Sequence, residues 1–212
     1  MTHTHHRTGP LEELKKEFIV LITSSKFVKY DNEPASVKKA LEILVKHEPI
    51  NYGNMAVGNR YLKDKEEILS KFRETCNVIL AVFDSDEKVK KVLKELKEAD
   101  LGLSVVVSGV YEEIFKLLSE VGLSPHTINL SLGVWGKSEK LPPQEVLEIT
   151  TMCGHGMVSP YHVNKMISEI EKGKLSPESA VIDLARPCIC GIVNTKRAEE
   201  SLRRLIKKYR KS

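Results

Sequence analysis

Two short turns, residues 152–156 and 187–191, place the strongest constraint on the fold, because they carry three of the chain's four cysteines. Each has the pattern of one metal-binding side chain, one spacer and a second metal-binding side chain. Together they supply four donors, the number that a tetrahedral zinc ion or an iron–sulfur cluster requires. A shared metal centre requires a fold that brings the turns into contact. The predicted ligands are Cys153, His155, Cys188 and Cys190.

Zinc is the metal that this donor set favours. Three thiolates and one imidazole match a closed, four-coordinate Zn²⁺ site, which in most proteins is structural. The alternative is a [4Fe-4S] cluster with His155 as an unusual fourth ligand, or with an open iron that meets a substrate. Gly154, Gly156 and Gly191 allow the tight backbone turns that either centre needs.

Two other interpretations of the turns remain open. Cys188 and Cys190 can form a redox dithiol, or Cys153 can act as a nucleophile with His155 as its base. Alternatively, Cys153 and Cys188 are small buried residues and His155 ends a helix by hydrogen bonding. The fourth cysteine, Cys76, stands alone, and we expect it to be a core residue.

A second group of polar residues is the candidate ligand-binding set. Residues 51–61 combine glycines with Asn54, Asn59 and Arg60, and Trp135 lies between two glycines near a predicted strand end. If the protein is an enzyme, its iron–sulfur or zinc centre opens into an interdomain cleft lined by these side chains. A helix start after Ser108-Gly109 is a place where a small anionic ligand can bind.

The composition and charge limit the partners and the cellular location that we expect for this protein. The 212 residues carry a formal net charge of only +4, so the field of the whole chain argues against nucleic acid as a partner. The basic tail, residues 203–211, is the one feature that favours a nucleic-acid or partner-binding module. No apolar run approaches the roughly 18 residues of a membrane span, and the polar first residues are unlike a signal peptide. We expect a cytoplasmic protein, where clustered cysteines are metal ligands or redox thiols more often than disulfides.

The fold class follows from alternating apolar patterns. Residues 78–83, 101–107 and 127–134 are expected strands, and residues 86–99 and 111–121 are amphipathic helices between them. Short links between alternating strands and helices predict a mainly parallel sheet and an α/β fold. A further buried strand is expected at residues 18–22.

The predicted domain organisation has three parts. Residues 1–10 form a disordered leader, residues 11–136 form the α/β domain, and residues 137–212 form a smaller all-helical domain that carries the metal site. The boundary lies in a Gly-, Lys- and Pro-rich stretch, residues 133–143. Beyond it, Ser159-Pro160 and Ser176-Pro177 have the pattern of an N-cap followed by an N1 proline, and Asn194 is a third expected cap.

Overall fold

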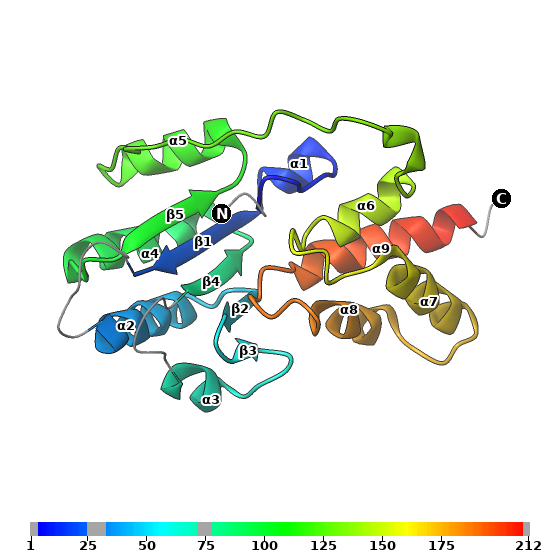
Figure 1. The fold of residues 1–212 in the computed structure, drawn as a ribbon, viewed down its shortest axis with the longest axis horizontal. Helices are drawn as coiled ribbons and strands as arrows, with labels where there is room; N and C mark the ends of the chain where they lie inside the picture. Colours follow the sequence, from blue (N-terminus) through cyan, green and yellow to red (C-terminus); the bar gives the residue numbers. More distant parts are fainter. Residues whose placement is uncertain (1–3, 25–32, 72–77, 210–212) are drawn as a thin grey trace.

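The centre of the molecule is one five-stranded antiparallel sheet (Figure 1). The computed structural model describes residues 4–24, 33–71 and 78–209. The strand order is β3-β2-β4-β1-β5, and every pair of neighbours is antiparallel. The strands are β1 (Phe18–Thr23), β2 (Asn51–Asn54), β3 (Gly58–Asn59), β4 (Val78–Phe83) and β5 (Ser104–Ser108).

The prediction of a mainly parallel sheet is wrong, because β1 lies between the two strands that were expected to be neighbours. β4 and β5 run in the same direction and are linked by α4 (Asp86–Ala99), but each pairs with β1 in the antiparallel sense. The third expected strand, residues 127–134, has no strand structure, and its residues are exposed.

Both faces of the sheet are covered, which explains the uninterrupted apolar runs of β1 and β4. On one face, Phe18, Val20 and Ile22 belong to the same hydrophobic core as the helices that follow β1, β3, β4 and β5. These helices are α2 (Glu33–Lys46), α3 (Lys65–Ser70), α4 and α5 (Tyr111–Glu120). On the other face, Ile19 and Leu21 share a core with the C-terminal helices.

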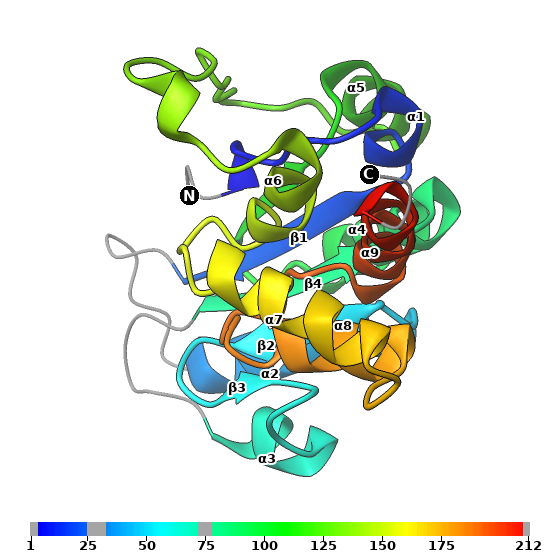
Figure 2. The same ribbon diagram turned by 90° about the vertical axis from the view of Figure 1, so that its right-hand side faces the viewer.

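The four C-terminal helices gather on one side of the sheet, where Figure 2 shows them in front of β1, β2 and β4. They are α6 (Gln144–Thr150), α7 (Pro160–Glu171), α8 (Pro177–Ala185) and α9 (Thr195–Tyr209). Their buried side chains join Leu80 and Val82 of the sheet in one continuous core. Whatever domain boundary the chain has, the C-terminal helices do not bury their apolar faces by themselves.

The caps predicted for these helices are confirmed. The Ser159 and Ser176 hydroxyls accept hydrogen bonds from the main-chain N–H groups of His162 and Ser179, with a proline opening each helix. Asn194 Oδ1 accepts from the Arg197 N–H at 3.2 Å. These caps fix where α7, α8 and α9 begin, and therefore where the two Cys/His turns lie between helices.

The remaining segments are short or irregular. Residues 4–10, expected to form a leader, lie against the fold and lead into α1 (Leu11–Leu14). A long exposed stretch from residue 124 to 142 joins α5 to α6 and includes one short 3₁₀ turn, η2 (Ser138–Lys140). In the part of the chain that the structure describes, no helix is both long and apolar enough to cross a membrane.

Candidate metal centre

The two Cys/His turns meet beside the edge of the sheet that β3 and β2 form. The first turn follows α6, the second follows α8, and the hairpin of α7 and α8 separates them in sequence. The Sγ atoms of Cys188 and Cys190 are 3.6 Å apart, and Cys190 Sγ lies 3.8 Å from His155 Nδ1. The thiols of Cys153 and Cys188 lie close enough to each other to shift each other's pKa. The fold therefore connects all four predicted ligands in series.

The site has a buried side and an open side. Cys153, Cys188 and Cys190 are free thiols with exposed fractions of 2%, 0% and 1%. His155 and its neighbour Gly156 are exposed. An ion held here would have its sulfur ligands inside the core and its imidazole at the surface.

Without a metal, the thiols of Cys153 and Cys188 hold their protons. The hydrogen bond with Cys188, followed by burial, raises the pKa of the Cys153 thiol far above its ordinary value. The contact with Cys153 lowers the pKa of Cys188, but the contact with Cys190 and burial outweigh it and raise this pKa to about 12. Deprotonation therefore needs a compensating positive charge, and a metal cation supplies one.

Main-chain N–H groups also affect the pKa values of these two thiols. Those of His155 and Met157 interact with Cys153, and that of Ile192 interacts with Cys188, in each case favouring the thiolate. Such N–H to sulfur contacts orient thiolate ligands and stabilise their charge in metal sites. They oppose the effects of burial, which favour the thiol.

Asn59 at the end of β3 holds the second turn. Its Nδ2 atom lies 3.1 Å from the carbonyl oxygens of both Ala185 and Arg186, and 2.7 Å from that of Cys188. One buried amide thus interacts with three carbonyls at and just beyond the C-terminal end of α8, where a helix leaves carbonyl oxygens without partners inside the helix. Its own oxygen accepts from the N–H of Tyr61.

Two glycines allow the sheet and this turn to touch. A Cβ atom added at Gly191, whose φ is +73°, would lie 2.2 Å from the carbonyl carbon of Tyr52. A Cβ atom at Gly53 would lie 2.7 Å from the carbonyl carbon of Cys190. Only glycine fits either position, because real Cβ atoms do not approach backbone so closely.

The other predicted ligand-binding residues do not converge on a common cavity. Asn54 donates to the carbonyls of Ile68 and Lys71, close to α3. Arg60 donates to the carbonyls of Pro49 and Ile50, and its guanidinium lies over the Tyr52 and Tyr61 rings. Trp135 is 82% exposed on the α5–α6 connection.

Arg7, which was assigned to the leader, connects the two turns through main-chain carbonyls. Its Nη2 atom donates to the carbonyls of Met152, at 2.9 Å, and Ile192. Met152 precedes Cys153 directly, and Ile192 comes two residues after Cys190. Sequence reasoning missed this residue because an arginine in a polar N-terminal stretch carries no sign of burial.

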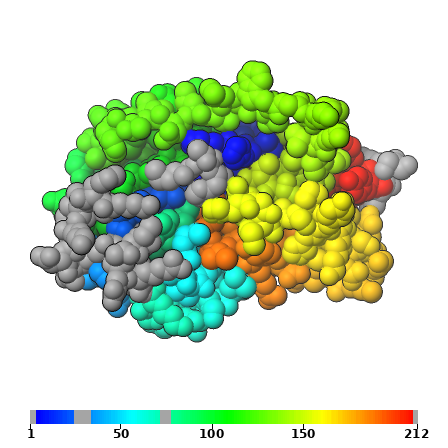
Figure 3. Space-filling view, viewed as in Figure 1, coloured from blue at the N-terminus to red at the C-terminus, as the bar shows by residue number. Residues whose placement is uncertain are grey.

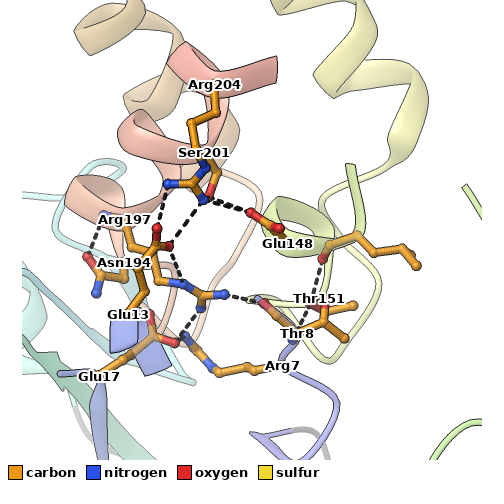
Figure 4. A network of polar contacts seen from close by, with 11 residues as sticks. Arg7, Thr8, Glu13, Glu17, Glu148, Thr151, Asn194, Arg197, Ser201 and Arg204 are labelled. Atoms are coloured by element: carbon orange, nitrogen blue, oxygen red, sulfur yellow. Dashed lines mark hydrogen bonds and ion pairs between the residues drawn. The ribbon is translucent and has the colours of Figure 1, made fainter. Parts of the chain in front are cut away.

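A buried carboxylate holds Arg7 in place. Glu17 Oε2 lies 2.7 Å from Arg7 Nη1 and 2.7 Å from Arg197 Nη1, and all three side chains are buried (Figure 4). Burial raises the pKa of the Glu17 carboxyl, but the two guanidinium charges outweigh it and hold this pKa below the ordinary value. Glu17 is therefore ionised, as a buried guanidinium pair requires.

Three basic residues of α9 form ion pairs within the fold. Arg204 pairs with Glu13 and Glu148, Arg203 with Glu178 and Glu199, and Lys208 with Glu145. The acidic residues come from α1, α6, α8 and α9 itself. These charges therefore attach α9 to the neighbouring elements.

Comparison of the chain with family models, curated proteins and solved structures gives no match. Across residues 4–24, 33–71 and 78–209, no group of three or more His, Cys, Asp or Glu side chains is already arranged to hold a metal ion. The four donors of the candidate centre touch in series, so an ion would have to draw them into a closed shell. Cys76 lies outside the described residues.

Proposed function

We propose that the protein binds one zinc ion through Cys153, His155, Cys188 and Cys190. The observation that carries this proposal is the contact of Cys190 Sγ with Cys188 Sγ at 3.6 Å and with His155 Nδ1 at 3.8 Å. With the usual Zn–S and Zn–N bond lengths, the ligand atoms of a tetrahedral site are about 3.8 Å (S to S) and about 3.5 Å (S to N) apart. Both observed distances agree with a shared ion to within a few tenths of an ångström.

The spacing favours a single ion over an iron–sulfur cluster. In a [4Fe-4S] cluster each cysteine binds a different iron, so the cysteine sulfurs lie on opposite corners of the cluster. Sulfurs 3.6 Å apart instead occupy neighbouring positions around one metal. The inorganic core of a cluster would also need room between Cys188 and Cys190, both of which are fully buried.

A structural role agrees with the surroundings of the site. Four protein ligands fill the coordination shell of zinc and leave no position for a substrate. The ligand turns connect α6 to α7 and α8 to α9, and the second turn is packed on β2 and β3. Zinc would therefore fasten the helical layer to the sheet, and we place the protein in the cytoplasm, where thiols stay reduced.

The alternatives have weaker support. A nucleophilic or redox cysteine needs a lowered pKa and access to its partner, whereas Cys153 and Cys188 are buried and have raised pKa values. An enzyme with an interdomain cleft would need Asn54, Asn59 and Arg60 to face open space. Their side-chain nitrogens bind main-chain carbonyls instead.

Metal analysis of protein purified without oxygen tests the proposal. We expect one zinc per chain, no acid-labile sulfide and no visible absorption. Replacement of zinc by cobalt should give the absorption bands of a tetrahedral thiolate site. Cys188→Ser should lose the metal, and Cys76→Ser, which changes the cysteine outside the site, should keep it.

Three results would contradict zinc binding at this site. The first is metal-free protein that takes up no zinc when zinc is supplied after reduction. The second is stoichiometric iron with sulfide and a brown chromophore, which would assign a cluster to the same turns. The third is zinc that remains bound in both Cys188→Ser and Cys153→Ser.

A further inference from the structure

The outer edge of β5 is open and lacks the features that usually prevent strands from pairing. β5 pairs with β1 on one side, and no strand of the described residues pairs with its other side. Its sequence, Ser-Val-Val-Val-Ser, contains no charge and no proline. Natural edge strands normally carry a lysine, a proline or a bulge at such a position. This edge is therefore suited to accept another strand.

The space beside this edge has the size of one strand. A cavity of about 750 Å³ follows β5, is bounded by α5 and residues 123–131, and also reaches side chains of β1, α4 and the N-terminal segment. A five-residue strand added to a sheet fills a slab about 17 Å long, 4.8 Å wide and 10 Å thick, or on the order of 800 Å³. The cavity can therefore receive a single extended segment of about the length of β5.

The chain contains one unpaired segment with the sequence of a strand. Residues 127–134 alternate polar and apolar side chains, as a strand with one buried face does. The structure leaves its apolar side chains in solvent: Ile128 is 46% exposed, Leu130 65%, Leu132 84% and Val134 66%. In Figure 3 this part of the chain forms the upper rim of the molecule, above the recessed N-terminal residues.

We propose that the cavity is filled by a second copy of the chain, and that residues 127–134 of each protomer add to β5 of the other. The exchange is reciprocal, so one two-fold axis closes both open edges. The four apolar side chains of the segment, which are 46–84% exposed, are the surface that such an exchange would bury. Neither β5 nor residues 127–135 carry a charge that would repel the partner.

The segment's position in its own protomer favours exchange over closure within one chain. Residues 127–131 already line the cavity, yet they form no ladder with β5. Leu132 and Val134 lie beyond the part of the segment that lines the cavity and remain exposed. As a strand on β5 of the other protomer, the segment would pack its apolar face against the core and turn its polar face toward water.

Light scattering coupled to gel filtration tests the proposal on the full chain. We expect twice the chain mass of 23.9 kDa. The variant Leu130→Lys/Leu132→Lys places two charges on the apolar face and should elute as a monomer. The control, Asn129→Lys/Ser131→Lys, places the same charges on the polar face and should remain a dimer.

Circular dichroism of both variants should match that of the parent chain, which separates a lost interface from a lost fold. A parent chain that is monomeric at its highest soluble concentration overturns the proposal and assigns the segment to its own protomer. A dimer that persists in Leu130→Lys/Leu132→Lys also overturns it, because another surface would then hold the copies together.

Discussion

The side-chain amide of Asn59 lies 2.7 Å from the carbonyl oxygen of Cys188, so the short strand β3 supports the turn that carries two of the proposed ligands. The contact joins residues 129 positions apart in the sequence. The position of the sulfurs thus depends on the sheet as well as on the helices that flank the turn.

Asn59→Ala should weaken both the fold and zinc binding. Removing the amide leaves the carbonyls of Ala185, Arg186 and Cys188 without this donor, and we expect a loss of about 2–4 kcal/mol in unfolding free energy. Asn54→Ala is the matched control, because Asn54 is equally buried but binds carbonyls near α3. It should lower stability without changing zinc affinity. Urea unfolding and competition with a zinc chelator measure the two effects, and equal zinc affinities for the two variants would contradict the role given to Asn59.

Gly191→Ala should prevent the second turn from reaching the sheet. The added Cβ atom would lie 2.2 Å from Tyr52, whereas at Gly156, with a similar φ of +69°, a Cβ atom meets nothing within 4 Å. Both substitutions force alanine into the left-handed region, which costs about 1–2 kcal/mol. Only Gly191→Ala adds a steric clash, so we expect its loss of stability to exceed that of Gly156→Ala by several kcal/mol. Similar unfolding midpoints for the two variants would show that the turn and the sheet can separate easily.

Arg7→Ala should be among the most destabilising single substitutions in the chain. It removes a buried guanidinium that binds Glu17 and the carbonyls of Met152 and Ile192, and breaking a buried ion pair costs about 3–5 kcal/mol. The control is Arg204→Ala in the same network, whose half-exposed ion pairs contribute only about 1 kcal/mol. Thermal and urea unfolding of the two variants give the comparison. A loss below that of Arg204→Ala would mean that residues 4–10 do not hold the turns.

Glu17 should make the protein sensitive to acid. Because its folded-state pKa lies below the ordinary value, the stabilisation is complete above the ordinary carboxyl pKa of about 4.5 and is lost as the pH falls through the lowered value. Unfolding free energy measured by urea titration should therefore decrease below about pH 4.5. The Glu17→Gln variant should have a lower unfolding free energy at neutral pH, and this free energy should change less as the pH falls into the acid range. An acid dependence unchanged by Glu17→Gln would assign the effect to other carboxylates.

Zinc binding should strengthen with rising pH. The raised pKa values of Cys153 and Cys188 mean that both thiols carry protons at neutral pH, and these protons must leave when a metal binds. Calorimetry in buffers of different ionisation enthalpy should detect release of at least two protons per bound ion, one from each of these cysteines. Binding without proton release would show that the ion does not use them.

The convergence of the cysteine turns could be predicted from residue types and spacing, but the structure around them could not. Ser159-Pro160 and Ser176-Pro177 mark helix starts locally, so the positions of the turns followed from the sequence. The direction of the strands could not be predicted, because the apolar run of β1 is buried on both faces and has the same pattern in either direction. The side chains of Asn59 and Arg60 suggested a ligand, whereas in the fold they bind main-chain carbonyls: Asn59 those at the end of α8, and Arg60 those of Pro49 and Ile50. Residues 127–134 have the pattern of a strand that finds no partner within the described chain.

The contact between Arg7 and Ile192 spans 185 positions of the sequence. During synthesis, Arg7 can pair with Glu17 early, but its contact with the Ile192 carbonyl has to await almost all of the chain. Contacts of such long range form late and slow the folding of a chain. The centre proposed here would therefore be completed after translation of β1 to β5, when Cys188 and Cys190 become available. Until α6 to α9 have been made, the face of the sheet that carries Ile19, Leu21, Leu80 and Val82 lacks the helices that cover it in the finished fold.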